Sequence, residues 1–294
     1  MVEKLTPSRI IFNIFNVLLV ALFCVLCFAP IWHVFISSIS DPRQLMMTTG
    51  INWRPVGDVQ WRAYEMVLNN RGIITGYINT IIYVTSATML GLALTAIAGY
   101  VLSCKSKLRV SFMIAIIFTM MFSGGLIPSY IVNMSLGLID NRLSVILPGA
   151  TNAFFIIIMK NAFEQLPESF AESAKLDGAG PLKIMIYILL PMVKATIAVI
   201  ALFLIMIRWN SWFHEAIYLA RSRDLWPLQL VMREILVNQD VSTVTAGEAA
   251  AMANLMVQPI RHAVTIVGTI PVLFVYPFIQ KYFVAGVTLG GVKG

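Results

Sequence analysis

Residues 10–39 read IIFNIFNVLLVALFCVLCFAPIWHVFISSI, a run of 30 residues that contains no Asp, Glu, Lys or Arg. A helix needs about 20 apolar residues to cross the ~30 Å hydrocarbon core of a bilayer. The run is also far longer than the roughly 7–15 apolar residues of a cleaved signal peptide, and no A-x-A-like cleavage site follows it. We therefore expect a retained first membrane helix.

The composition of the whole chain agrees with this expectation. Of its 294 residues, 59% are hydrophobic and 12% are charged, whereas a soluble domain carries about 45–50% and roughly 25%. A soluble fold could not bury so much apolar surface. A disordered chain and a disulfide scaffold are excluded by the high apolar content and by the presence of only three cysteines. We expect an all-α integral membrane protein surrounded by lipid.

Six charge-poor runs are long enough, or nearly long enough, to span the bilayer. The fourth has only 17 residues and contains Pro148 and Gly149, and the fifth contains Lys194, close enough to one end to snorkel. We expect a single domain, residues 1–294, with an inner loop at 160–183 and an outer loop at 208–262. The six predicted spans are residues 10–39, 73–104, 111–132, 143–159, 184–207 and 263–280.

Basic residues near the ends of membrane helices favour the cytoplasmic side. With a cytoplasmic N-terminus, the inner segments carry 11 Lys or Arg and 5 Asp or Glu, and the outer segments carry 10 and 9. The cation counts barely differ, but the short hairpin 104–111 has three cations and no acid, and every lysine lies inside. We expect both termini in the cytoplasm. The net charge of +7 is then largely an inner-face charge and indicates no nucleic-acid partner.

The signals of catalytic chemistry are missing from the sequence. It contains no G-x-x-x-x-G-K-[ST] phosphate loop and no G-x-S-x-G nucleophile motif. His33, His214 and His262 lack ligand spacing, and the Cys24–Cys27 pair lies in an apolar helix. We expect neither an enzyme nor a metal site. An ion-coupled carrier or channel is an alternative class, but such proteins usually bury ionisable residues in the membrane, and the six spans contain no acidic residue.

The inner loop 160–183 has seven charges in 24 residues. Ser169 and Glu172 have the spacing of a capping box and predict the start of a short helix. That helix should end near Asp177-Gly178, because glycine readily takes the positive φ of a helix C′ position. Pro181 suits the first turn of a second helix, and Pro191 should kink the fifth span. By pattern alone, an ordinary amphipathic cytoplasmic loop is an equally good interpretation.

The same loop resembles the EAA motif of binding-protein-dependent ABC importer permeases. Glu172-Ser173-Ala174 is followed at the motif's spacing by Gly178, Ile188 and Leu190-Pro191, with Ser173 in place of the usual alanine. The run ESAKLDGA is similar to the carbohydrate-uptake branch. The resemblance implies a type I importer permease fold with six membrane helices and a cytoplasmic coupling helix. It assigns contact with the ATPase to Glu172, Ser173, Ala174, Asp177, Gly178 and Ala179.

The resemblance extends along the chain and implies partners. Residues 124–128 (GGLIP), 147–149 (LPG), 209–212 (WNSW) and the tail 280–294 are similar to the smaller maltose-type permease. The family implies a second, homologous permease subunit, two ATPase subunits that bind ATP and Mg, an extracytoplasmic solute-binding protein and a location in a bacterial cytoplasmic (inner) membrane. No cofactor is expected in this chain. The tail 286–294 should reach between the ATPase subunits, with a frayed terminus as the alternative.

The translocated substrate is expected to be an oligosaccharide. Sugars stack on aromatic rings and exchange hydrogen bonds with amides, although the same side chains also serve helix packing. The outer loop 208–262 is the expected docking segment for the binding protein. Because every outer cation is an arginine, which binds carboxylates bidentately, acidic alginate- or pectin-type oligosaccharides are plausible; nine outer acids keep a neutral sugar open. The candidate path residues are Asn79, Tyr83, Asn152, Trp209, Asn210 and Trp212.

Overall fold

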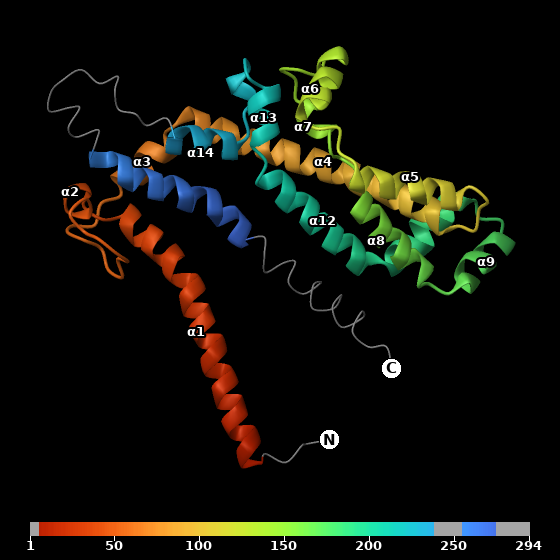
Figure 1. Ribbon diagram of the computed structural model, residues 1–294, viewed down its shortest axis with the longest axis horizontal. Helices are drawn as coiled ribbons and strands as arrows, with labels where there is room; N and C mark the ends of the chain where they lie inside the picture. Colours follow the sequence, from red (N-terminus) through yellow and green to blue (C-terminus); the bar gives the residue numbers. More distant parts are fainter. Residues whose placement is uncertain (1–5, 238–254, 275–294) are drawn as a thin grey trace. The chain divides into compact units, whose positions relative to one another are not determined.

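The computed structural model describes residues 6–237 and 255–274, and every regular element within these ranges is helical (Figure 1). The chain divides into two units, residues 1–71 with 232–270 and residues 72–231 with 271–294, which are treated separately. The elements are α1 (Pro7–Ser38), α2 (Pro42–Leu45), α3 (Arg62–Leu68), α4 (Arg71–Ser103), α5 (Arg109–Met121), α6 (Leu126–Ser135), α7 (Leu143–Ile146), α8 (Ala153–Glu164), α9 (Glu168–Leu176), α10 (Pro181–Lys183), η1 (Ile184–Leu189), α11 (Leu190–Met192), α12 (Lys194–Trp209), α13 (Phe213–Tyr218), η2 (Arg223–Leu225), α14 (Leu228–Val237) and a helix at Leu255–Phe274.

The first unit is built around α1, which Figure 1 shows as one long helix. Its 32 residues extend about 48 Å at 1.5 Å per residue, more than a bilayer core requires. The large apolar side chains between Ile10 and Ile31 are exposed, as expected for a helix in contact with lipid or another membrane subunit. The predicted first span is therefore present as a continuous helix.

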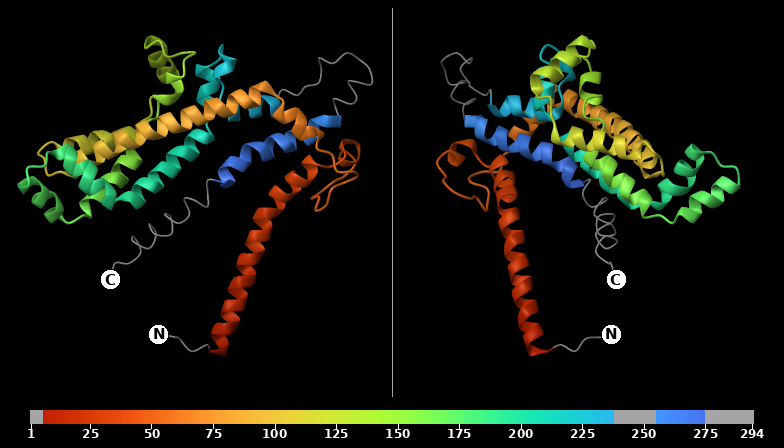
Figure 2. Two further views of the ribbon diagram at one scale, coloured as in Figure 1. Left: turned by 180° about the vertical axis from the view of Figure 1, so that it is seen from behind. Right: turned by 45° about the vertical axis from the view of Figure 1, so that its right-hand side comes forward.

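The second unit packs α4 against α8, α12 and the segment 147–152. In lipid, helices associate through close packing, because the surrounding chains are as apolar as leucine. Gly91 allows such an approach, since a Cβ there would lie 2.5 Å from the carbonyl oxygen of Ala150. Figure 2 shows α9 at the end of α8 and α12 remote from α6 and α13. The core of this unit consists of Phe155, Met159, Phe163, Ala174, Ile184, Leu189, Val193, Ile200 and Leu204.

The third and fourth predicted spans are not continuous helices. Within 111–132 the chain leaves α5 at Phe122, and Gly125 takes a φ of +84° before α6 begins; the two helices are bent by 114°. Within 143–159, α7 ends after one turn and α8 begins only at Ala153. Gly149 lies between them with a φ of +69°, a conformation that glycine tolerates and other residues rarely adopt.

The fifth predicted span, 184–207, is bent at Pro191. Proline lacks an N–H and clashes with the carbonyl four residues earlier in a regular helix, and the chain widens into the π-helix η1 directly before it. Val193 then departs from helical angles, and the segments Pro181–Met192 and Lys194–Trp209 meet at 86°. The predicted kink in the fifth span is therefore confirmed.

By length and composition, three helices of the described residues can cross a membrane, Pro7–Ser38, Arg71–Ser103 and Leu255–Phe274. The number rises to five if each bent pair is one span. Six spans therefore stay a prediction. The last helix begins eight residues before the predicted boundary at 263, and residues 275–280 of that prediction lie outside the described ranges, as does the tail 286–294.

Candidate functional site

The helix α9 occupies the inner loop where the sequence predicted one. It begins at Glu168, with Pro167 as N-cap and no side-chain cap hydrogen bond, so the predicted capping box of Ser169 and Glu172 was wrong. Pro167 fixes its own backbone and directs the chain into the helix, which places Ser169 inside the first turn instead of ahead of it. Glu168, an acid in the first turn, suits the positive end of the helix dipole.

The C-terminal end of α9 is a Schellman motif, the 6→1 and 5→2 hydrogen-bond pair that closes many helices. The N–H of Ala179 donates to the carbonyl of Ala174 at 2.9 Å, and the N–H of Gly178 donates to that of Lys175 at 3.0 Å. Gly178 has the required positive φ, +77°. The prediction of a glycine-terminated helix is confirmed.

The two faces of α9 have different surroundings. Ala174 is buried in the core of the second unit, and Ala179 packs beside it. Glu172, Ser173, Asp177 and Gly178 are exposed. Next to them, Leu176 is 89% exposed. One face therefore packs α9 against η1 and the core of the second unit, and the other presents charges and an apolar side chain.

A second attachment of α9 is ionic and was not anticipated from the sequence. Lys105, in the turn between α4 and α5, pairs with Glu168 at 2.7 Å. Glu164, at the end of α8, pairs with Arg109 and with Lys160, the latter at 2.7 Å. The hydrogen bond from Lys105 lowers the pKa of Glu168, and the same bond raises the pKa of Lys105. The spacing Lys160–Glu164 was a readable i,i+4 signal, but the pairs 55 and 63 residues apart were not.

The predicted path residues Asn79 and Tyr83 are buried and hold a loop. The side-chain amide of Asn79 donates to the carbonyls of Asp224 and Trp226 at 2.7 and 3.1 Å. Its oxygen accepts from Arg142 at 3.1 Å. The hydroxyl of Tyr83 donates to the carbonyl of Leu225 at 2.7 Å. In this structure both side chains anchor the segment 224–226.

The remaining predicted path residues do not meet at one place. Trp209 is buried beside the ring of Tyr77, and the exposed Asn210 donates to the carbonyl of Met206 in its own helix. Trp212 lies edge-on to Phe213. Asn152 caps α8 by accepting from the N–H of Phe154 at 2.9 Å. Of the six, Asn152 alone lines the cavity described next.

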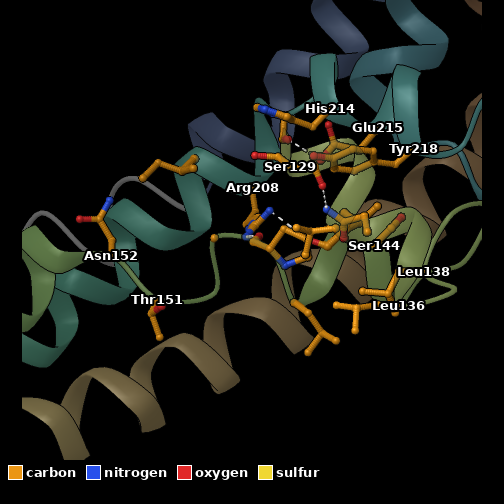
Figure 3. Close-up of a pocket in the computed structure, with 18 of the residues that line it drawn as sticks. Ser129, Leu136, Leu138, Ser144, Thr151, Asn152, Arg208, His214, Glu215 and Tyr218 are labelled. Carbon is orange, nitrogen blue, oxygen red and sulfur yellow. Dashed lines mark hydrogen bonds between the residues drawn. The ribbon is translucent and has the colours of Figure 1, made fainter. Parts of the chain in front are cut away.

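That cavity, here called the outer cavity because it includes part of the predicted outer loop 208–262, has a volume of about 770 Å³. It lies among α6, α7, the segment 147–152, α12 and α13 (Figure 3). Its wall is mainly apolar, with a small number of polar groups. They include Ser129, Asn133, Ser144, Asn152, Arg208, Ser211, His214, Glu215 and Tyr218.

Two charged side chains of opposite sign line the outer cavity. Arg208 donates to the carbonyls of Val145 and Pro148 at 3.0 and 2.5 Å. Glu215 is 2% exposed, and one of its oxygens accepts from the hydroxyl of Ser211 at 2.5 Å. Burial raises the pKa of the neighbouring Tyr218, a shift that its hydrogen bond with Asn133 opposes and the charge of Glu215 increases.

The sequence analysis did not predict this cavity because its lining comes from three separate stretches of the chain, residues 128–138, 144–155 and 204–218. Arg208 and Glu215 are close to the WNSW motif, but each was an isolated charge beyond the end of a predicted span. A charge at such a position is usually solvated, so the sequence carried no signal of burial. The breaks at Gly125 and Gly149 are what bring α6 and α7 to the same place.

Comparison with known proteins identifies the family. Residues 110–289 match the family of binding-protein-dependent transport system inner membrane components. The chain is 36% identical over 277 residues to the polygalacturonan/rhamnogalacturonan transport system permease protein YtcP of Bacillus subtilis strain 168, covering 93% of this chain and 95% of YtcP. It is 45% identical to Protein LplC of the same organism over 61% of this chain and 60% of LplC.

A solved structure shows the same fold. The chain matches, with a TM-score of 0.84 and 33% identity, a chain of a bacterial ABC transporter involved in the import of the acidic polysaccharide alginate. The match covers 96% of this chain and 99% of the other. This protein therefore belongs to the binding-protein-dependent transport system inner membrane components, the membrane permeases of ABC importers. The resemblance of its inner loop to that family is confirmed.

Proposed function

We propose that this chain is one permease subunit of an ATP-driven importer that moves an acidic oligosaccharide across the bacterial cytoplasmic membrane by alternating access. The observation that carries the proposal is the full-length match to a chain of the alginate transporter. Two relatives that match almost the whole chain with at least 33% identity are named as transporters of acidic polysaccharides, alginate and polygalacturonan. Both are uronate polymers, so a carboxylate on each sugar unit is the shared chemistry.

In this proposal α9 is the coupling helix, and its exposed face contacts an ATPase subunit. Leu176, Glu172 and Asp177 are all exposed on α9, so this face is accessible to an ATPase subunit. The ion pair Lys105–Glu168 joins α9 to the 104–109 segment, and Arg109–Glu164 joins the same segment to the end of α8. These pairs support a common, cytoplasmic side for both loops and a cytoplasmic N-terminus. Two ATPase subunits would supply ATP and Mg chemistry, and a second permease subunit and a solute-binding protein would complete the importer.

The test is reconstitution of the two permeases with the ATPase subunits in proteoliposomes, followed by uptake of oligogalacturonate in the presence of the binding protein. Uptake should require ATP on the side of the vesicle membrane where the ATPase subunits lie. It should continue when no ion gradient is present. Transport driven by a proton or sodium gradient in ATP-depleted vesicles would favour the ion-coupled carrier. Uptake of neutral oligosaccharides alone would exclude the acidic substrate and leave the importer class intact.

The coupling role has its own test. Glu172→Lys or Gly178→Asp should leave membrane insertion intact and abolish transport, because one reverses a charge on the exposed face and the other strains the end of α9. The Ser135→Cys variant, on an exposed position of α6, serves as a control for handling. Substrate-stimulated ATP hydrolysis at the wild-type rate in either coupling variant would contradict the role of α9.

A further inference from the structure

We infer that the outer cavity is a binding subsite for one uronate unit of the transported oligosaccharide, with Glu215 accepting sugar hydroxyls and Arg208 binding the carboxylate. This inference rests on the proposed function and adds a location and two recognition groups. The volume of the outer cavity, about 770 Å³, lies within the roughly 300–1,000 Å³ of typical ligand sites. The cavity is formed within this subunit, from α6, α7, α12 and α13.

The first indication is an unpartnered carboxylate oxygen. The side chain of Glu215 is only 2% exposed, and its Oε1 accepts a hydrogen bond from the hydroxyl of Ser211. Its Oε2 is buried and has no hydrogen-bond partner among the residues that the structure describes. Such a group is costly to bury unless a donor reaches it. A hydroxyl of a bound sugar is a donor of the right kind, and Glu215 lines the space in which the sugar would lie (Figure 3).

The second indication is the way in which Arg208 is held. A guanidinium carries five N–H donors, and the bonds to Val145 and Pro148 use one N–H on each terminal nitrogen. Backbone carbonyls orient the group without neutralising its charge. The second N–H on each terminal nitrogen remains for a ligand, and a carboxylate is the anion whose geometry matches this fork.

The rest of the wall suits a sugar ring. Tyr218 and Phe155 offer aromatic surface, and Ser129, Ser144 and Asn152 offer further donors and acceptors. A guanidinium and a carboxylate together favour a ligand that carries both an anionic group and several hydroxyls. Each unit of a uronate oligosaccharide has both, whereas a neutral sugar would leave the charge of Arg208 without a ligand partner.

The direct experiment is protection of a cysteine by substrate. Ser129 and Ser135 are both exposed on α6, and each hydroxyl bonds a carbonyl of its own helix region, at 2.7 and 2.8 Å. Only Ser129 lines the outer cavity. In a complex whose Cys24, Cys27 and Cys104 are replaced by serine, Ser129→Cys and Ser135→Cys would each be alkylated with a membrane-impermeant maleimide, with and without oligogalacturonate.

Oligogalacturonate delivered by the binding protein should slow alkylation at position 129 and leave position 135 unchanged. The methyl-esterified oligomer should protect less, because Arg208 then has no carboxylate to bind. The sugar-free binding protein is measured in parallel, so that docking alone is not taken for protection. Equal rates with and without sugar at position 129, or equal protection at both positions, would overturn the inference.

A second variant tests Glu215 itself. Glu215→Gln keeps the shape of the side chain but replaces one oxygen with a donor, so the apparent KM for oligogalacturonate uptake should rise by on the order of tenfold or more. A binding role predicts this rise with kcat largely retained, whereas a purely structural role would reduce both together with the yield of folded complex. An unchanged KM contradicts the inference. If the variant does not assemble, the cysteine protection decides.

Different results would refute the proposed function and the subsite. Wild-type complex that takes up no uronate oligomer under any condition refutes the proposed function, and the subsite is refuted with it. Wild-type complex that takes up oligogalacturonate without protecting position 129 refutes the subsite alone.

Discussion

Replacing Gly178 with alanine should loosen the end of α9 without any steric clash. The φ of Gly178 is +77°, and a Cβ built there meets no atom within 4 Å. The cost is therefore confined to the backbone, and a left-handed conformation costs a residue other than glycine roughly 1–2 kcal/mol. Both hydrogen bonds of the Schellman motif depend on this conformation, so the penalty falls on the Ala174–Ala179 turn.

Gly180 supplies the matched control, two residues further on. A Cβ at Gly180 also meets no atom within 4 Å, but its φ is −70° and its ψ 160°, an extended conformation that alanine adopts freely. Gly180→Ala should be neutral or should stabilise by about 0.4–1 kcal/mol, because the unfolded chain loses freedom. The two substitutions add the same methyl group and differ in the sign of φ.

Hydrogen–deuterium exchange of the peptide that covers residues 168–180 measures the effect. A penalty of about 1–2 kcal/mol raises the open fraction of this segment by roughly 5- to 30-fold in Gly178→Ala, with no increase in Gly180→Ala. Gly178→Asn should fall between them, because asparagine tolerates the left-handed region. Equal exchange in the two alanine variants would refute the reasoning, since it would mean that φ at 178 does not control the end of α9.

Three further outcomes are expected. Gly91→Ala should lower thermal stability in detergent, because its methyl group would lie 2.5 Å from a backbone oxygen. Such overpacking costs about 1–3 kcal/mol, more than the gain in helix propensity. Gly124→Ala should leave thermal stability unchanged, because the nearest atom to its methyl group would be 3.9 Å away. Asn79→Ala should destabilise by about 1–3 kcal/mol for each buried partner left unsatisfied, and unchanged melting would show that the 224–226 loop is anchored elsewhere. The pKa of Glu168 is lowered, so its pairing with Lys105 stabilises the folded state at pH values above the unfolded pKa and is lost as the pH falls through the folded pKa. Hydrogen–deuterium exchange near residue 168 should therefore rise on acidification in the wild type. In Glu168→Gln the exchange should lose this pH dependence.

The sequence predicted the helical class, the family and the form of the inner loop because these depend on local signals. A charge-free run of 30 residues is long enough to span a bilayer as a helix. The Asp177-Gly178-Ala179 turn depends on a glycine and its immediate neighbours. Such features need no knowledge of distant contacts.

The breaks in the spans and the outer cavity depend on tertiary contacts. Gly125 and Gly149 were visible in the sequence, but a glycine within an apolar run does not reveal whether the helix continues through it. Asn79 and Tyr83 had residue types suited to a sugar path, yet their hydrogen bonds run to residues more than 140 positions away. The burial of Glu215 likewise depends on α6 and α7, which pack over it. The sequence around position 215 does not predict that burial.

The double attachment of α9 has a consequence for how the importer should respond to solution conditions. Its contact through Ala174 and Ala179 is apolar and indifferent to salt, whereas its pairing with Lys105 is exposed. The Debye length falls from about 10 Å at 0.1 M salt to about 3 Å at 1 M. Ionic strength should therefore detach the α4–α5 turn from α9 while its apolar contact with η1 and the core stays in place, so that a force on α9 reaches only part of the subunit.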